Sequence, residues 1–126
     1  MPAEISVLVV DEDLEVLELT GTFLERNHDA ITVATETDAE TAIERAIEED
    51  VDVVVSDYRM PRIDGIELYE RLAEHRPELP FFLFTAAVKD VKSSAKAAGI
   101  TGYVQKGSGT DHYDELAEKI VEAVDE

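Results

Sequence analysis

The sequence of 126 residues contains no cysteine. It can therefore form neither disulfide bonds nor thiolate metal sites, which fits a reducing compartment. Long apolar runs are also missing: no stretch approaches the roughly 18 apolar residues that a membrane helix requires. The N-terminal "MPAEISVLVV" lacks the basic start of a signal peptide. These absences predict a soluble cytoplasmic protein that does not associate with membranes.

Basic residues are scarce. Lysine and arginine number 11 against 30 aspartates and glutamates, so the formal net charge is −19. A surface this acidic repels nucleic acid phosphate and anionic lipid, and direct nucleic acid binding by this chain is not expected. The acidic residues are spread among periodic apolar positions, which indicates a solvated shell on a folded domain. The composition resembles that of proteins from organisms with a very salty cytoplasm; an ordinary acidic protein is the alternative.

Apolar patterning predicts the fold class. A length of 126 residues and a hydrophobic share of 44% fit a single domain spanning residues 1–126. Strands are expected at 5–10, 30–35, 51–56, 80–85 and 102–105. Helices are expected at 14–27, 65–75, 88–98 and 113–124, and one more helix is expected to begin after Thr37 or Asp38. The strands are nearly all apolar, which favours a parallel sheet buried on both faces. We therefore predict an α/β fold: a doubly wound, five-stranded parallel sheet of flavodoxin-like (βα)5 type, with strand order 2-1-3-4-5.

Polar residues cluster at the carboxyl ends of these strands, where a doubly wound sheet places its functional crevice. They are Asp11, Glu12 and Asp13 after the first strand, Asp57 after the third, Thr85 at the end of the fourth and Lys106 after the fifth. Taken alone, each has an ordinary explanation, such as helix capping by Asp13 or solvation of Lys106. Their coincidence on one edge of the sheet indicates a functional site.

The charges of this set favour metal-assisted phosphoryl chemistry. Carboxylates packed within a few ångströms repel one another, so the site either keeps a proton or recruits a hard divalent cation. Mg²⁺ fits best, because it prefers one or two carboxylates together with water and phosphate oxygens. With the metal and Lys106 compensating its charge, Asp57 can attack a phosphoryl group and form an acyl phosphate. Thr85 can then donate a hydrogen bond to a phosphoryl oxygen.

Four motifs, which carry five elements in order along nearly the whole chain, are similar to those of response-regulator receiver domains of two-component signalling. "VLVVDED" resembles the acidic pair after the first strand, and "DYRMPRIDG" matches the loop D-x-x-M-P-x-x-D-G. "LFTA" resembles the switch threonine with its following small residue, and "GYVQK" the switch aromatic residue and the lysine. The resemblance implies a signalling phosphoacceptor that catalyses only its own phosphorylation and dephosphorylation.

The resemblance also implies roles for individual residues. Asp57 would be the phosphoacceptor, with Lys106 contacting the phosphate and Thr85 and Tyr103 forming the conformational switch. Asp11, Glu12, Asp57 and the Arg59 carbonyl would bind Mg²⁺. A histidine kinase or phosphotransfer protein would be the donor, and the output partner is unknown.

Two residues depart from the family pattern. Glu12 stands where the second acid is most often aspartate, and Gly107 follows Lys106 where the family usually has a proline joined by a cis bond. A cis bond without proline costs about 2.5–4 kcal/mol, so a trans bond is expected here. Because of these departures, an alternative interpretation stays open: a receiver-like interaction module that is never phosphorylated. A haloacid-dehalogenase-like phosphatase and a flavodoxin-like FMN carrier fit the motifs less well.

Three of the five lysines recur at helical spacing in the predicted fourth helix. Lys89, Lys92 and Lys96 fall on one stripe, opposite an apolar face made of Val88, Val91, Ala95 and Ala98. Like charges so placed do not stabilise a helix. Pairing with nearby acids is one explanation, and a docking face for an acidic partner surface is the other. His28, His75 and His112 lie far apart in the pattern and are expected to be surface residues.

The excess of negative charge predicts a salt response. Repulsion in the folded state should weaken as ionic strength rises, because the screening length falls from about 10 Å at 0.1 M to about 3 Å at 1 M. The unfolding temperature should therefore climb between low salt and molar KCl, followed by circular dichroism. A flat or falling curve would contradict adaptation to high salt.

Overall fold

The computed structural model of the chain describes residues 4–86, 88–107 and 111–125, with the side chains of residues 88–90, 92 and 125 outside that description. In this part of the chain five strands alternate with five helices. They are β1 (Ile5–Val10), α1 (Leu14–Asn27), β2 (Ile31–Glu36), α2 (Ala39–Glu48), β3 (Val53–Ser56), α3 (Gly65–His75), β4 (Phe81–Thr85), α4 (Val88–Ala98), β5 (Gly102–Gln105) and α5 (Asp111–Asp125). None of the helices within these ranges is long and apolar enough to cross a membrane.

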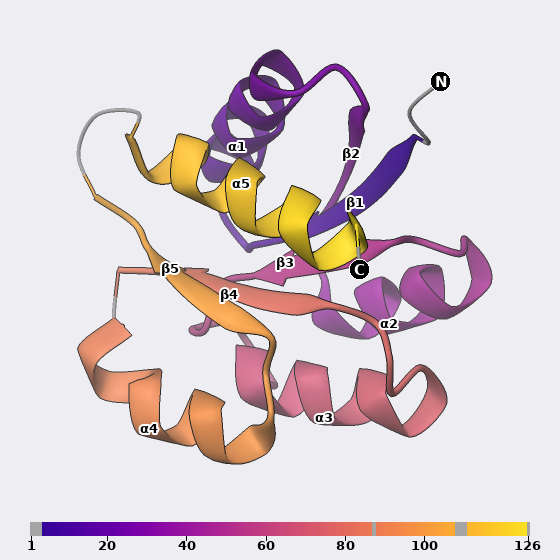
Figure 1. The fold of residues 1–126 in the computed structure, drawn as a ribbon. Coiled ribbons are helices and arrows are strands. Elements are labelled where there is room, and N and C mark those ends of the chain that lie inside the picture. The colour runs from indigo at the N-terminus through magenta and orange to yellow at the C-terminus, as the bar shows by residue number, and fades with distance from the viewer. Residues whose placement is uncertain (1–3, 87, 108–110, 126) are drawn as a thin grey trace.

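The strands form one parallel sheet in the order β2-β1-β3-β4-β5. Helices α1 and α5 cover one face of the sheet, and α2, α3 and α4 cover the other (Figure 1). The predicted doubly wound sheet and its strand order are therefore confirmed. Because all the strands run in the same direction, their carboxyl ends meet at one edge.

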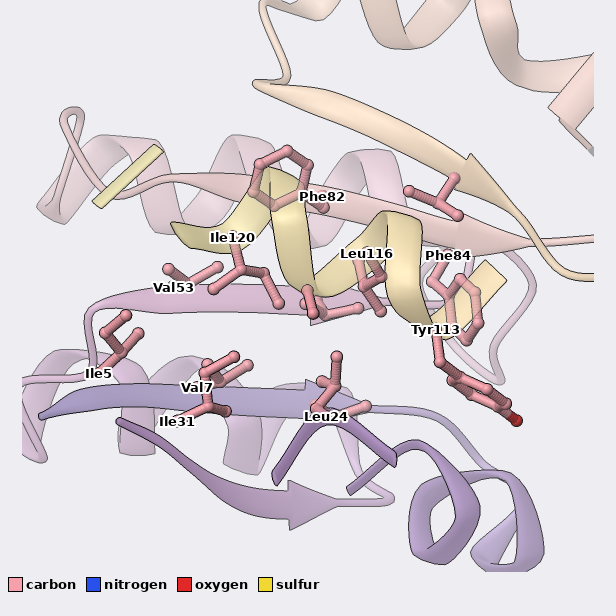
Figure 2. Packing of buried hydrophobic residues seen from close by; sticks show 14 of the residues in the cluster. Ile5, Val7, Leu24, Ile31, Val53, Phe82, Phe84, Tyr113, Leu116 and Ile120 are labelled. Atoms are coloured by element: carbon pink, nitrogen blue, oxygen red, sulfur yellow. The ribbon is translucent and has the colours of Figure 1, made fainter. Parts of the chain in front are cut away.

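Two apolar cores lie on either side of the sheet. On the α1/α5 face, Val7 of β1 and Val53 of β3 pack with Leu24 of α1 and with Leu116 and Ile120 of α5 (Figure 2). The opposite face packs Leu8, Val54, Leu68, Leu83 and Ala95. Burial on both faces explains why the central strands read as continuous apolar runs.

Aspartate caps begin three of the helices. Asp13, Asp38 and Asp64 each precede a helix and accept a hydrogen bond from backbone N–H groups of its first turn. Hydrogen bonds from the hydroxyl and the backbone N–H of Thr41 lower the pKa of Asp38. The sequence predicted a possible cap at Asp13 and a helix that begins after Thr37 or Asp38, and the structure confirms both.

Gly65 fixes the segment that follows β3. Its N–H donates to the Tyr58 carbonyl at 2.8 Å. A Cβ added at Gly65 would lie 2.5 Å from the Asp57 carbonyl oxygen and 2.7 Å from Cδ2 of Leu83, closer than atoms can approach. Only glycine therefore lets the first turn of α3 pack against the backbone of Asp57.

Element boundaries differ from the prediction by one or two residues in four elements. β2 spans Ile31–Glu36 rather than 30–35, and β4 begins at Phe81 rather than Pro80. β3 begins at Val53 rather than Val51, because Asp52 bonds to Ser6 through both its backbone N–H and its carboxylate, each at 2.8 Å. α5 begins at Asp111, two residues before the predicted start at Tyr113.

The core on the α1/α5 face makes a matched pair of substitutions informative. Leu24 is fully buried, whereas Leu19 on the same helix is 43% exposed. Leu24→Ala should lower the free energy of unfolding by about 2–5 kcal/mol, because it removes buried methyl groups and leaves a cavity. Leu19→Ala should stay within about 0.5 kcal/mol of the wild type in the same urea titration. Equal losses in the two variants would contradict this packing.

Candidate functional site

Three charged side chains meet at the carboxyl edge of the sheet. Nζ of Lys106 lies 2.7 Å from Oδ2 of Asp11 and 3.5 Å from Oδ2 of Asp57. The carboxylates follow the neighbouring strands β1 and β3, whereas the lysine follows β5 and reaches past the end of β4. On this path its ammonium lies 5.6 Å from the ring centroid of Phe84. One cation thus faces two anions that the sequence separates widely.

Backbone hydrogen bonds extend the sheet by one residue to hold this set in place. The Asp11 N–H donates to the Glu36 carbonyl at 3.2 Å, and the Asp57 N–H donates to the Val10 carbonyl at 3.0 Å. The Lys106 N–H donates to the Thr85 carbonyl at 3.0 Å. Each charged residue is therefore hydrogen-bonded to a neighbouring strand, and the sheet restrains the backbone positions of the site residues.

The two carboxylates have different surroundings. Asp11 is only 3% exposed, and both of its oxygens are engaged: Oδ1 accepts from the Asp13 N–H at 2.9 Å, and Oδ2 faces Lys106. The Asp57 side chain is 18% exposed, and its Oδ1 accepts from the Tyr58 N–H at 2.8 Å. Asp57 is therefore the carboxylate that a solvent-borne molecule can reach, while Asp11 is a buried counterion.

The other predicted site residues lie around this centre. Thr85 is buried at the end of β4, next to Lys106 through the backbone bond. The side chains of Glu12 and Arg59 are exposed. Across the described ranges, no group of three or more histidine, aspartate or glutamate side chains is arranged to hold a metal ion. The structure thus brings together Asp11, Asp57 and Lys106, and it does not draw the Glu12 carboxylate into a preformed cluster.

Thr85 and Tyr103 lie on adjacent strands. The register pairs Leu83 with Tyr103 and Thr85 with Gln105. Since side chains alternate along a strand, Thr85 and Tyr103 point to the same face, two residues apart in register. Tyr103 is half-buried and packs against the core on the α2/α3/α4 face.

The predicted lysine stripe lies on α4. Val91 and Ala95 are buried against the sheet, and Lys96 is exposed. The side chains of Lys89 and Lys92 lie outside the described part of the structure, so their alignment with Lys96 stays a prediction.

Sequence reasoning missed two aromatic neighbours of Lys106. Phe84 supplies the ring beside the ammonium, and His112 accepts a hydrogen bond at Nδ1 from the Gly107 N–H at 3.1 Å. His112 was expected at the surface, but it is half-buried, with its ring centroid 4.1 Å from that of Tyr113. No cis peptide bond occurs among the described residues, so the bond from Lys106 to Gly107 is trans, as predicted.

Comparisons with known proteins agree with this arrangement. Residues 7–120 match the response regulator receiver domain family. A protein-glutamate methylesterase/protein-glutamine glutaminase of Dechloromonas aromatica (strain RCB) is 33% identical over 95% of this chain and 37% of its own length. The alkaline phosphatase synthesis transcriptional regulatory protein PhoP of Bacillus subtilis (strain 168) is 35% identical over 64% of this chain and 32% of its own length.

Solved structures show the same fold. The response regulator domain of Thermotoga maritima CheB superposes with a TM-score of 0.87 at 24% identity, covering 98% of both chains. The chemotaxis response regulator CheY4 of Vibrio cholerae superposes with a TM-score of 0.80 at 23% identity, covering 94% of this chain and 99% of its own.

The chain belongs to the response regulator receiver domain family, because the family match extends over most of its length. It spans about a third of the length of the curated relatives named above. The class of protein is therefore a signalling receiver domain.

Proposed function

We propose that Asp57 is the phosphoacceptor of this receiver domain and that Lys106 assists the transfer. The observation that supports this is the Lys106 ammonium, which lies between the buried Asp11 carboxylate at 2.7 Å and the accessible Asp57 carboxylate at 3.5 Å. Asp11 fixes the lysine, and of the two carboxylates that the lysine faces, Asp57 is the more accessible to solvent. A receiver-like module that is never phosphorylated would not require an accessible carboxylate beside a fixed ammonium, so that alternative is not favoured.

The reaction follows from these positions. An Asp57 carboxylate oxygen attacks phosphorus, and the bond from phosphorus to the donor's nitrogen or oxygen breaks, with the electron pair leaving on the donor. The product is an acyl phosphate on Asp57, with no change in oxidation state. Lys106 can contact a phosphoryl oxygen and offset the added negative charge. The Thr85 hydroxyl would donate to another phosphoryl oxygen.

Mg²⁺ fits the donor set of this site. Two carboxylates face one ammonium, which leaves a net negative charge that a divalent cation offsets, and Mg²⁺ favours one or two carboxylates with water. Asp11 and Asp57 would ligate it directly, the Arg59 carbonyl would complete the protein ligands, and the exposed Glu12 would act through water. When bound, the ion would supply charge neutralisation for the incoming phosphoryl group.

The wider setting follows from the family. A histidine kinase or phosphotransfer protein would donate the phosphoryl group, since receiver domains act within two-component signalling. Its place of action would be the cytoplasm. The output partner would dock on the face of α4, β5 and α5, where the exposed Lys96 lies and where the predicted stripe with Lys89 and Lys92 would add positive charge to a protein whose net charge is −19. That net charge supports an origin in a halophile.

Phosphoryl uptake tests the assignment of Asp57. The protein is incubated with acetyl phosphate and Mg²⁺, and the intact mass is followed. The wild type should gain one phosphoryl group, and Asp57→Asn should gain none, because an amide cannot form the acyl phosphate. Removal of Mg²⁺ with EDTA should also block the gain.

Asp13→Asn is the matched control for this experiment. Asp13 lies close to the site in sequence but caps α1, and asparagine caps helices equally well. This variant should be phosphorylated like the wild type. Uptake by Asp57→Asn at the wild-type level would show that another residue is the acceptor.

Hydrogen exchange tests the switch. Thr85 and Tyr103 share one face of adjacent strands, so movement of Thr85 toward a phosphoryl group frees space toward which Tyr103 can turn. Phosphorylation, or beryllofluoride as a mimic, should change exchange in residues 86–106 more than in residues 36–50, measured by mass spectrometry. Equal changes in the two segments would argue against this route to the α4 face.

A further inference from the structure

Gly107 gives this chain a peptide N–H that the proline usual at this position lacks. That N–H donates to Nδ1 of His112 at 3.1 Å, across five residues of sequence. An imidazole nitrogen accepts only when it carries no proton, so the proton of a neutral His112 sits on Nε2. Glycine in place of the usual proline therefore introduces an N–H donor, and His112 supplies the acceptor for it.

The backbone on both sides of Lys106 is held by hydrogen bonds. The Lys106 N–H donates to the Thr85 carbonyl at 3.0 Å, and the next N–H, that of Gly107, donates to His112. These bonds fix the peptide planes before and after the Lys106 Cα atom, and hence the direction in which its side chain leaves the backbone. The first bond comes from the sheet, whereas the second depends on one side chain of α5.

Ring contacts join the same residues. The His112 ring centroid lies 4.1 Å from that of Tyr113 and 5.4 Å from that of Phe84. Phe84 in turn lies beside the Lys106 ammonium, 5.6 Å from its ring centroid. His112 is thus linked to Lys106 in two ways: by the hydrogen bond from the Gly107 N–H and by the ring of Phe84, which lies beside both residues.

We infer that His112 is a positioning residue for Lys106, and through it for phosphoryl transfer to Asp57. The inference rests on the proposed function, because it assumes that Lys106 assists the reaction at Asp57. His112 acts on the lysine backbone through Gly107 and needs no contact with the phosphoryl group. The alternative is that its ring merely packs the start of α5 and has no effect on the chemistry.

Two substitutions at His112 separate the hydrogen bond from the ring. His112→Asn keeps an acceptor oxygen close to the place of Nδ1 and loses the ring, whereas His112→Phe keeps the ring and loses the acceptor. The rate constant of phosphorylation by acetyl phosphate in Mg²⁺ should fall about two- to tenfold in His112→Phe, the effect of one ordinary hydrogen bond. It should stay near the wild-type value in His112→Asn. Equal rates in the two variants, whether both normal or both slow, would overturn the inference.

Gly107 supplies the second half of the test. Gly107→Ala keeps the N–H, and its Cβ would meet nothing within 4 Å. Gly107→Pro removes the N–H. The difference between the two His112 variants should persist in the Gly107→Ala background and vanish in the Gly107→Pro background. A difference that survives in Gly107→Pro would show that the bond is not the route.

The wild-type protein provides a check that needs no variant. In nitrogen-15 NMR spectra, Nδ1 of His112 should behave as an unprotonated acceptor, and the Gly107 amide should exchange slowly with solvent. A proton on Nδ1 at neutral pH, or rapid exchange at Gly107, would overturn the inference even if His112→Phe did not fold.

Asp57→Asn separates the two proposals. If this variant still takes up a phosphoryl group, the assignment of Asp57 fails. If it takes up none while the two His112 variants react at equal rates, Asp57 remains the acceptor and only the role of His112 is overturned.

Discussion

One ammonium group between two carboxylates is the interaction on which the functional edge of this protein depends. Lys106 contacts the buried Asp11 at 2.7 Å and lies 3.5 Å from the more accessible Asp57. Without the lysine, two anions would face each other where little water can screen them. The parallel sheet makes this meeting possible, because β1, β3 and β5 all end at the same edge. The fold therefore determines the geometry, and the three charges determine the chemistry.

The chain surrounds this site with an unusually acidic surface, at a net charge of −19. Basic residues are scarce, so the positions of the few that occur are informative. Arg45 binds Glu36 and Glu49, and the hydrogen bond that Arg45 donates to Glu49 contributes most to raising the pKa of Arg45. Lys106 serves the site, and Lys96 lies exposed on α4. Under the proposed function, an anionic phosphoryl donor would approach this surface against repulsion, which salt would reduce.

Much of this arrangement could be predicted from the sequence. Apolar runs predicted each strand because burial on both faces leaves no room for polar residues, and the chain order predicted which polar residues share an edge. The packing of side chains could not be predicted. Nothing in the pattern places Phe84 beside the Lys106 ammonium, because that contact depends on the path of the lysine side chain past β4. Nothing places His112 at the Gly107 N–H either, because that contact depends on how α5 returns to the sheet. The later start of β3 likewise depends on a hydrogen bond between distant residues.

A double-mutant cycle between Asp11 and Lys106 tests most directly whether this ion pair holds the edge together. The free energy of unfolding is measured for the wild type, Asp11→Asn, Lys106→Met and the double variant. Methionine keeps most of the length of lysine and removes its charge and its N–H donors. We predict a favourable coupling of about 1–3 kcal/mol, because the pair is largely removed from solvent. Effects that add within about 0.3–0.5 kcal/mol would contradict it.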